Sequence, residues 1–223
     1  MGSKNKLKRF KENETFKNVI QPTREEVVNH FSHKGKWHSF FENNNPIVVE
    51  LGCGKGEYTI ALARKNPNKN YVGIDIKGAR FWRGAKTAIE ENLPNVAFVR
   101  TQIELVDFIF AENEVSEIWI TFPDPQIKYQ RTKHRMTNTS FMKKYHHILN
   151  EKGIMNLKTD SEFMHGYTLG LLHGAGHEVL YANHTVYKNE GAPKEVTETQ
   201  TFYENQYLEV GKPITYIQFR LKY

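Results

Sequence analysis

A glycine-rich turn holds the first residues whose types and spacing point to ligand binding. Three glycines stand at alternate positions from Gly52 to Gly56, and an acid, Glu50, precedes them by two residues. Glycines let a backbone pass close to a bound nucleoside because they have no Cβ atom. The dinucleotide-binding pattern G-x-G-x-x-G would need a glycine in place of Glu57, and the two acids would repel a pyrophosphate. The turn therefore favours a cationic or neutral ligand, such as S-adenosylmethionine with its amino group and sulfonium.

Two further polar residues stand at the expected ends of the next strands along the chain. Asp75 follows Glu50 by 25 residues, where a carboxylate can accept hydrogen bonds from the ribose hydroxyls of an adenosine. Gln102 ends the third expected strand, where a side-chain amide can hydrogen-bond the edge of an adenine. Because the carboxyl ends of parallel strands share one edge of a sheet, these side chains are expected to line one site.

A proline-flanked aspartate ends the fourth expected strand. Asp124 stands between Pro123 and Pro125, and prolines fix φ, which holds the carboxylate in place as catalysis by positioning requires. Nucleic-acid amino-methyltransferases place an Asx-Pro-Pro-aromatic segment at this strand end to grip the target base, although the order differs here. A basic group follows, made of Lys128, Arg131, Lys133, His134 and Arg135. An acid suited to a base edge thus lies close to cations suited to phosphates.

The chain alternates apolar runs typical of strands with runs of helical periodicity, and this order positions the polar residues. The predicted strands are 47–51, 71–76, 96–101, 117–122, 153–158, 179–184 and 214–221. The predicted helices are 23–41, 58–65, 79–92, 104–110, 138–149 and 163–174. Strands that alternate with helices indicate an α/β fold with a mostly parallel sheet, right-handed crossovers and helices on both faces. The sheet is expected to have seven strands.

Length and charge predict one domain with a basic arm. The chain has 223 residues, and at roughly 150 residues per domain this favours a single domain, 21–223, with an extension. Residues 1–20 are polar and basic, so we expect a flexible arm. The cations of the arm are Lys4, Lys6, Lys8, Arg9 and Lys11. Both basic groups can neutralise phosphates, although a lysine-rich tail can also serve only solubility. A polar stretch, Lys188–Thr199, is expected to be a mobile loop.

Composition excludes several classes of protein. Cys53 is the only cysteine, which rules out a disulfide scaffold, and 39% of the residues are hydrophobic, which argues against disorder throughout. No apolar run approaches the roughly 18 residues of a membrane helix. The start of the chain lacks an apolar signal region, so we expect a cytoplasmic protein. His173 and His177 stand four apart, but the glycines between them weaken a helix, so we expect no metal site.

Six segments, in order, make the chain resemble the bacterial tRNA (guanine-N7)-methyltransferase family. They are Lys4-Asn5-Lys6-Leu7, Glu50-Leu51-Gly52-Cys53-Gly54-Lys55-Gly56, Gly73-Ile74-Asp75, Phe122-Pro123-Asp124-Pro125 with Lys128, Lys158-Thr159-Asp160 and Thr201-Phe202-Tyr203-Glu204. The glycine turn alone would indicate only a methyltransferase, whereas the proline-aspartate turn and the last two segments single out this family. The resemblance implies a Rossmann-like class I fold that depends on S-adenosylmethionine.

The resemblance also implies roles for residues of this chain. Its cofactor-binding positions are Glu50, Gly52, Gly54, Asp75, Gln102 and Asp124, and Asp124 also matches the active-site position. Its substrate-binding positions are Lys128, Asp160, Thr201, Phe202, Tyr203 and Glu204. Two departures are visible: Gln126-Ile127 stands where the family usually has Trp-Pro, and Gln102 where it more often has Asp or Asn.

The implied reaction moves a methyl group from S-adenosylmethionine to N7 of guanosine 46 in the variable loop of tRNA. Guanine N7 has a lone pair and no proton, so the reaction needs alignment rather than a general base. We expect tRNA as the partner, no metal, no membrane, and a monomer or homodimer without an obligate protein partner.

Three alternatives stay open at this stage. One is a non-catalytic tRNA-binding subunit of the same fold, which would have no use for an acidic cofactor edge. A nicotinamide oxidoreductase is disfavoured by the glycine spacing. A methyltransferase for small molecules or proteins would leave both basic groups unexplained.

Overall fold

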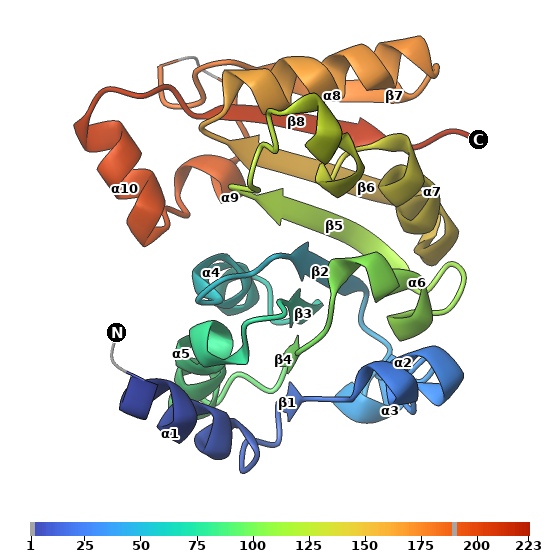
Figure 1. The fold of residues 1–223 in the computed structure, drawn as a ribbon, viewed down its shortest axis with the longest axis vertical. Coiled ribbons are helices and arrows are strands. Elements are labelled where there is room, and N and C mark those ends of the chain that lie inside the picture. Colours follow the sequence, from blue (N-terminus) through green and yellow to red (C-terminus); the bar gives the residue numbers. More distant parts are fainter. Residues whose placement is uncertain (1–2, 189–190) are drawn as a thin grey trace.

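A central sheet of eight strands organises the described part of the molecule (Figure 1). The computed structural model describes residues 3–188 and 191–223. The first two residues of the expected arm and residues 189–190 of the expected loop therefore lie outside the described residues. The strands are β1 (Val19–Ile20), β2 (Ile47–Leu51), β3 (Asn70–Ile74), β4 (Val96–Val99), β5 (Val115–Thr121), β6 (Leu149–Thr159), β7 (Glu178–Asn183) and β8 (Thr215–Arg220).

The strand order is β1-β4-β3-β2-β5-β6-β8-β7. The neighbouring pairs are parallel except those that β8 makes with β6 and β7. The seven predicted strands are confirmed as β2 to β8. The structure adds β1, in which Val19 and Ile20 pair with β4, because two apolar residues are too few to show a period in the sequence. The chain runs outward in both directions from β2 and β5, so the order switches between them, where open sheets bind ligands.

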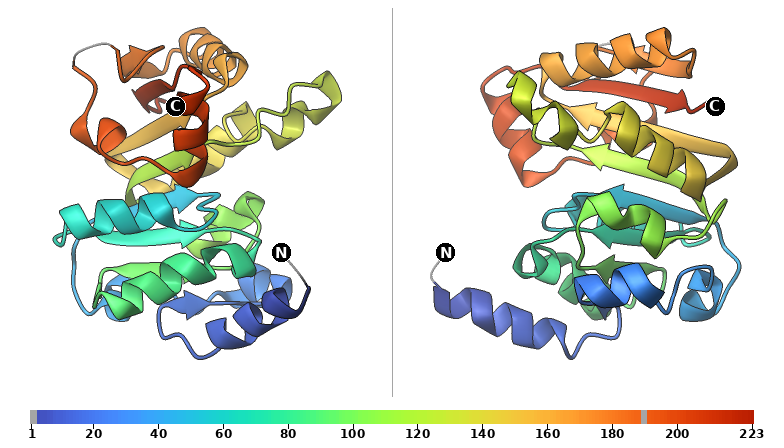
Figure 2. Two further views of the ribbon diagram at one scale, coloured as in Figure 1. Left: turned by 90° about the vertical axis from the view of Figure 1, so that its left-hand side faces the viewer. Right: turned by 45° about the vertical axis from the view of Figure 1, so that its right-hand side comes forward.

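Helices cover both faces of the sheet (Figure 2). The helices, including the short 3-10 helices η1 and η2, are α1 (Ser3–Asn13), α2 (Arg24–His30), α3 (Trp37–Phe41), α4 (Glu57–Lys65), α5 (Gly78–Glu90), η1 (Ile103–Leu105), α6 (Val106–Ile109), η2 (Tyr129–His134), α7 (Thr139–Ile148), α8 (Glu162–Gly174), α9 (Lys194–Thr197) and α10 (Phe202–Glu209). Two separate apolar clusters show the layers: α2, α3, α6, α7 and α8 pack on one face, and α4, α5, α9 and α10 pack on the other.

The two apolar clusters follow from the alternation of side chains along β2. Val49 and Leu51 enter the cluster on one face and Val48 enters the other, because successive side chains of a strand point to opposite faces. All five residues of β2 are buried, as expected for a parallel strand covered on both faces. Glu50 therefore points to the same face as Val48, toward helix α4.

The amino-terminal arm contains regular structure where it is described, which differs from the flexible arm expected over 1–20. Helix α1 packs against α5. Asn13 Nδ2 donates to the carbonyl of Gly78 at 3.0 Å, and the carboxylate of Glu12 accepts from Trp82 Nε1 at 2.9 Å and pairs with Lys86 at 3.3 Å. Much of the contact between α1 and α5 is polar. The sequence of α1 therefore lacks the regular spacing of apolar residues from which a helix is predicted.

Two other expectations are corrected by local chain geometry. The single helix expected over 23–41 is two helices, α2 and α3, because Gly35 between them has a left-handed φ of 71°. The loop expected over 188–199 contains α9, whose Val196 is fully buried. A residue anchored in this way holds the segment on the face that carries α4 and α5.

Candidate functional site

A cleft of about 470 Å³ opens at the carboxyl ends of the central strands. Gly52, Asp75, Gln102 and Asp124 line it together, so the structure brings these four predicted residues to one space. Its size lies within the range of small-molecule sites. Glu50 and Gly54 stand close to Gly52 in the sequence, but neither of them lines the cleft.

Three glycines shape the turn that follows β2. Gly52, Gly54 and Gly56 have φ angles of 75°, 56° and 74°, in the left-handed region that glycine adopts at low cost. A Cβ on Gly56 would stand 2.7 Å from the ring of Phe98. The N–H of Gly52 donates to the carbonyl of Ile74 at 2.8 Å, which anchors the turn to β3. The backbone path itself requires these glycines.

Asp75 follows β3 and has a fixed orientation. Its Oδ2 accepts from the N–H of Gly54 at 3.0 Å and its Oδ1 accepts from the N–H of Lys77 at 2.7 Å. The residue is 8% exposed and lines the cleft. Each carboxylate oxygen can accept more than one hydrogen bond, so Asp75 can still accept from the hydroxyls of a ligand.

Glu50 lies beneath the glycine turn. Its Oε2 accepts from both the N–H, at 2.9 Å, and the hydroxyl of Thr59, and its Oε1 accepts from Thr121 Oγ1 at 2.7 Å. Burial raises its pKa to about 7, and these hydrogen bonds oppose that shift. The carboxyl group therefore joins α4 and the end of β5 to β2, and its contact with a ligand stays a prediction.

Gln102 lies on the exposed rim of the cleft, with its amide oxygen already paired. Arg24 Nη1, at the start of α2, donates to Gln102 Oε1 at 2.5 Å. The amide NH2 is then the group left to face a ligand acceptor. Sequence reasoning missed Arg24, because it stands 78 residues before its partner and no local pattern links the two.

The proline-aspartate turn is held in an unusual backbone conformation. Phe122 and Gln126 have left-handed φ angles of 49° and 48°, which are costly for residues with a side chain. The N–H of Phe122 donates to the carbonyl of Lys158 at 2.8 Å, and the N–H of Gln126 donates to Asp124 Oδ1 at 3.1 Å. Asp124 is exposed at the mouth of the cleft, so a rigid turn presents its carboxylate there.

The basic group after this turn has exposed and buried members. The exposed members are Lys128, Arg131, Lys133 and His134. The last three lie in η2, which projects from the body of the molecule (Figure 2). Arg135 is 6% exposed, and its guanidinium donates to the carbonyls of Gln126 and Ile127, both at 3.1 Å. The expectation that Arg135 contacts phosphates is therefore wrong: it holds the turn from inside.

The predicted substrate residues at the start of α10 also include both buried and exposed side chains. Thr201 caps α10, and Glu204 completes a capping box with it. Glu204 is fully buried and pairs with Lys158 at 2.6 Å, so its carboxylate faces the interior. Phe202 and Tyr203 are 51% and 50% exposed, and Lys55 Nζ of the glycine turn lies 4.2 Å and 5.6 Å from their ring centroids. The two rings therefore border the glycine turn.

Asp160 is connected to this aromatic surface through Lys212. The Lys212 ammonium pairs with Asp160 and lies 4.8 Å from the ring centroid of Tyr207 in α10. The Tyr207 ring in turn lies 6.2 Å from that of Phe122. Lys128 stands beyond the other end of the turn, beside a second hollow that Asp124 also lines. The structure thus arranges the predicted substrate residues around the Phe122–Gln126 turn.

Several cleft residues were missed by the sequence analysis. Arg80, Met136 and Phe141 line the cleft. Arg80 follows Asp75 by five residues, so attention to the first turn of the next helix could have found it. Met136 and Phe141 offer apolar surface for a flat ring, but their types resemble those of any core residue.

Neither metal nor membrane sites are found in the part of the chain that the structure describes. Within residues 3–188 and 191–223, no group of three or more His, Cys, Asp or Glu side chains is arranged to hold a metal ion. In the same ranges, no helix is long and apolar enough to cross a membrane.

Strand β8 is inserted antiparallel between β6 and β7, and the glycine turn is followed by an acid at the end of the next strand. These features define a class I S-adenosylmethionine-dependent methyltransferase fold. Residues 44–217 match the protein family described as "Putative methyltransferase". The chain is 75% identical to the tRNA (guanine-N(7)-)-methyltransferase of Christiangramia forsetii over the full length of both. It belongs to the tRNA (guanine-N7)-methyltransferase family.

Two further comparisons agree with this assignment. The tRNA (guanine-N(7)-)-methyltransferase of Bacteroides fragilis is 46% identical over 98% of this chain and 86% of its own length. Among solved structures, the 16S rRNA methyltransferase KamB superposes with a TM-score of 0.64 over 85% of this chain and 94% of that chain, at 13% identity. The latter likeness shows the fold alone.

Proposed function

We propose that the protein transfers a methyl group from S-adenosylmethionine to N7 of guanosine 46 in the variable loop of tRNA. The observation that carries the proposal is the single cleft in which Asp75, held by two backbone donors, and Asp124, held by a proline turn, line the same space. The names of the relatives, tRNA (guanine-N(7)-)-methyltransferases, support it. We propose a cytoplasmic enzyme that acts as a monomer or homodimer, without an obligate protein partner.

The residues of the cleft suit S-adenosylmethionine. Asp75 accepts from the ribose hydroxyls, the free NH2 of Gln102 donates to the adenine edge, and Phe141 offers an apolar face to the ring. The backbone at Gly52 is left-handed, a conformation that glycine adopts at low cost and that would strain a residue with a side chain. When bound, this cofactor supplies an electrophilic methyl group on a cationic sulfonium. The carboxylates of the cleft lining, Asp75, Glu104 and Asp124, balance its cations, so the cleft has no net positive charge to repel the sulfonium.

Asp124 is the residue that we assign to the transfer step. Its carboxylate accepts from N1–H and N2–H of guanine and presents N7, whose lone pair needs no deprotonation, in line with the methyl group. The guanine ring gains positive charge as it is methylated, so a fixed carboxylate beside it favours the transition state. The hydrogen bond from Gln126 N–H keeps the carboxylate oriented.

The remaining predicted residues serve the tRNA. Lys128 and the exposed cations of η2 bind phosphates, and Phe202 and Tyr203 offer aromatic faces on which a base can stack. Asp160 contributes a carboxylate beside them. Tilting a guanosine out of its tertiary pairing costs roughly a few kcal/mol, which these contacts offset. Thr201 and Glu204 act through the start of α10, because the carboxylate of Glu204 is buried.

Replacing Asp124 with asparagine tests the proposal. The Asp124→Asn side chain keeps an oxygen for Gln126 N–H and loses only the charge, so kcat on unmodified tRNA should fall about 100-fold or more. Affinity for S-adenosylhomocysteine, measured by calorimetry, should fall much less than kcat, because Asp124 is one of several residues that line the cleft. Glu151→Gln is the matched control: Glu151 is an exposed carboxylate near the amino end of β6, so this variant should retain full activity.

The same assay with labelled S-adenosylmethionine locates the methylated base. Label at 7-methylguanosine 46 is expected. Label on another base would overturn the position, and an unchanged rate for Asp124→Asn would overturn the role of Asp124. Absence of both S-adenosylhomocysteine binding and tRNA methylation would favour the non-catalytic subunit.

A further inference from the structure

Lys158, near the end of β6, is a buried cation that the proposed mechanism does not use. Its side chain is fully buried, and its Nζ lies 2.6 Å from Glu204 Oε1. The same ammonium donates to the carbonyls of Val196 at 2.6 Å and Thr199 at 2.9 Å. A lysine ammonium has three protons, and these are its three closest acceptors. Tyr187 Oη lies farther away, at 3.4 Å, and donates to Glu204 Oε1 at 2.6 Å. Burial lowers its pKa to about 8, and the Glu204 carboxylate opposes that shift.

The three acceptors belong to one segment of chain, 196–204, which leads into α10. Glu204 uses its other oxygen to accept from the N–H of Thr201 at 3.3 Å, so the residue that pairs with Lys158 also caps the helix. The position at which α10 begins is therefore tied to the Lys158 ammonium. Phe202 and Tyr203 occupy the first turn of that helix and face outward beside the glycine turn.

The backbone of Lys158 contacts the proline-aspartate turn. Its carbonyl accepts from the N–H of Phe122, the left-handed residue that opens the proline-aspartate turn. Its ammonium also lies 5.9 Å from the ring centroid of Phe122. One residue therefore contacts both the turn that carries Asp124 and the segment that carries the aromatic pair.

Stability alone does not account for an ion pair at this place. Two charges removed from water cost several kcal/mol of desolvation each, and apolar residues of similar volume often replace a buried pair without loss of stability. What an apolar pair lacks is direction, because only hydrogen bonds fix the carbonyls of Val196 and Thr199 relative to β6.

We propose that Lys158 is a positioning residue for the methyl transfer, which sets the Asp124 turn and the Phe202–Tyr203 pair relative to each other from the end of one strand. This inference rests on the proposed function, since it concerns how the target guanosine is held. It predicts that loss of the ammonium reduces the rate of methyl transfer to tRNA, because the target guanosine is held less well, and leaves the affinity for the cofactor unchanged.

A double-mutant cycle separates positioning from stability. Lys158→Met alone leaves Glu204 buried without a partner and is expected to destabilise the fold. Lys158→Met with Glu204→Gln removes both charges and keeps a side-chain oxygen for the N–H of Thr201, so most of the loss in the midpoint of urea unfolding should be recovered. In the stable double variant, kcat/KM on tRNA should still fall about 100-fold, and S-adenosylhomocysteine should bind within about twofold of wild type. Lys144→Met, which breaks an ion pair with Asp107 on the other face, should methylate tRNA normally.

Amide hydrogen exchange gives a readout that does not depend on activity. Exchange in residues 196–204 of the double variant should become faster than in wild type. The 122–126 turn, which is held by the backbone carbonyl of residue 158, and the glycine turn should be unchanged. Recovery of wild-type activity together with stability, or unchanged exchange in residues 196–204, would overturn the inference. A larger activity loss in Glu204→Gln, which keeps the cap, than in Lys158→Met would also overturn it, because Glu204 would then act directly on the substrate. Wild-type protein that binds cofactor and does not methylate tRNA would instead refute the proposed function.

Discussion

Glu50 shows how burial changes the chemistry of a side chain whose type was readable in the sequence. Its position before the glycine turn suggested a ligand contact, whereas the structure surrounds it with Thr59 and Thr121 and little solvent. Burial raises its pKa to about 7. The folded state therefore retains a proton at pH values where the unfolded chain has released it.

The stability of the wild-type protein is predicted to contain a pH-dependent contribution from Glu50. The unfolded side chain titrates near 4.5 and the folded one near 7, so the folded state binds more protons between these values. The free energy of unfolding therefore decreases as pH rises through this window, by up to about 3 kcal/mol from this residue. Glu50→Gln has no such proton, and its stability relative to wild type should grow from pH 4.5 to 8 in urea unfolding.

The control for this measurement is again Glu151→Gln, whose stability should follow wild type across the same range. Parallel curves for Glu50→Gln and wild type would show that Glu50 does not carry a raised pKa. Both comparisons are made without ligand, so they do not depend on the proposed activity.

At the residue scale, the sequence predicts well which side chains reach the cleft, and predicts less well which polar side chains are buried. Asp75, Gln102 and Asp124 were placed correctly because the end of a parallel strand must open on one edge of the sheet. Glu204 and Arg135 were not, because their burial depends on partners that other elements bring. A capping box was readable at Thr201, but its pairing with Lys158 required the fold.

Helix α5 approaches the glycine turn closely at Gly84. A Cβ on Gly84 would stand 2.8 Å from the carbonyl oxygen of Lys55 and 3.1 Å from the Cα of Gly56. The aromatic ring of Phe98 fills the remaining space, at 2.8 Å from the same position. Two of these three neighbours are backbone atoms, so they cannot rotate away.

Gly84→Ala is predicted to destabilise the protein although alanine favours helices. The methyl group must push α5 away from the glycine turn, which costs roughly 1–3 kcal/mol of overpacking. Because the displaced residues border the cleft, affinity for S-adenosylhomocysteine should fall as well. Thermal unfolding and calorimetry measure the two effects.

Gly166→Ala provides the matched control within α8. A Cβ there meets nothing within 4 Å, so the variant should gain about 0.5–1 kcal/mol from helix propensity and leave cofactor affinity unchanged. Equal stability changes for the two variants would contradict the close approach of α5.

At the element scale, strands were easier to predict than helices. The seven long strands of the sheet carry apolar runs between turn residues, which makes them visible. Helix α1 was missed because much of its interface with α5 is polar, as in the contacts of Glu12 and Asn13. The break between α2 and α3 depends on the conformation of Gly35, and glycine permits that conformation without imposing it.

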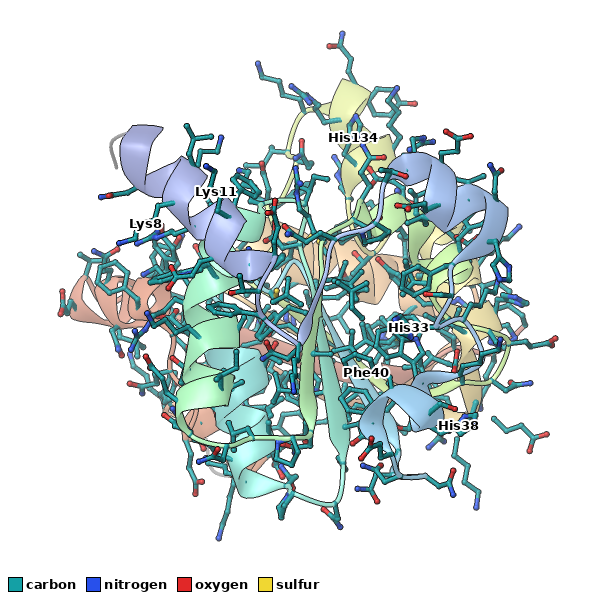
Figure 3. The ribbon with its side chains drawn as sticks, turned by 90° about the horizontal axis from the view of Figure 1, so that it is seen from below. Lys8, Lys11, His33, His38, Phe40 and His134 are labelled. Atoms are coloured by element: carbon teal, nitrogen blue, oxygen red, sulfur yellow. The ribbon has the colours of Figure 1, made fainter. Side chains whose placement is uncertain are left out.

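The whole molecule carries its positive surplus outside the cleft rather than within it. The cleft lining holds three carboxylates, Asp75, Glu104 and Asp124, and three cations, Lys77, Arg80 and Arg131, so these charges balance. The exposed cations of the arm and of the basic group are Lys6, Lys8 and Lys11 on α1, with Lys128, Arg131 and Lys133 at η2. Viewed from below, Lys8 and Lys11 and, farther along, His134 lie toward the same side of the molecule (Figure 3), and α1 and η2 project to the same side in the left view of Figure 2.

This separation predicts different salt dependence for the two ligands. Each phosphate neutralised by a cation contributes roughly −0.7 to −0.9 to the slope of log K against log salt. Four phosphate contacts from the two basic groups would give tRNA a slope of about −3, whereas S-adenosylhomocysteine, held in a cleft whose lining charges balance, should show a slope near zero. Filter binding and calorimetry from 50 to 200 mM KCl measure the two slopes.

Variants identify which cations produce the tRNA slope. Lys128→Gln with Arg131→Gln should reduce its magnitude by about 1.5 to 2, because both side chains are exposed beside the Asp124 turn. Lys152→Gln, an exposed lysine near the opposite, amino end of β6, should leave the slope unchanged. Equal reductions from the two sets of variants would mean that tRNA responds to the net charge of the protein. A cofactor slope as steep as that of tRNA would refute the placement of the positive surplus outside the cleft.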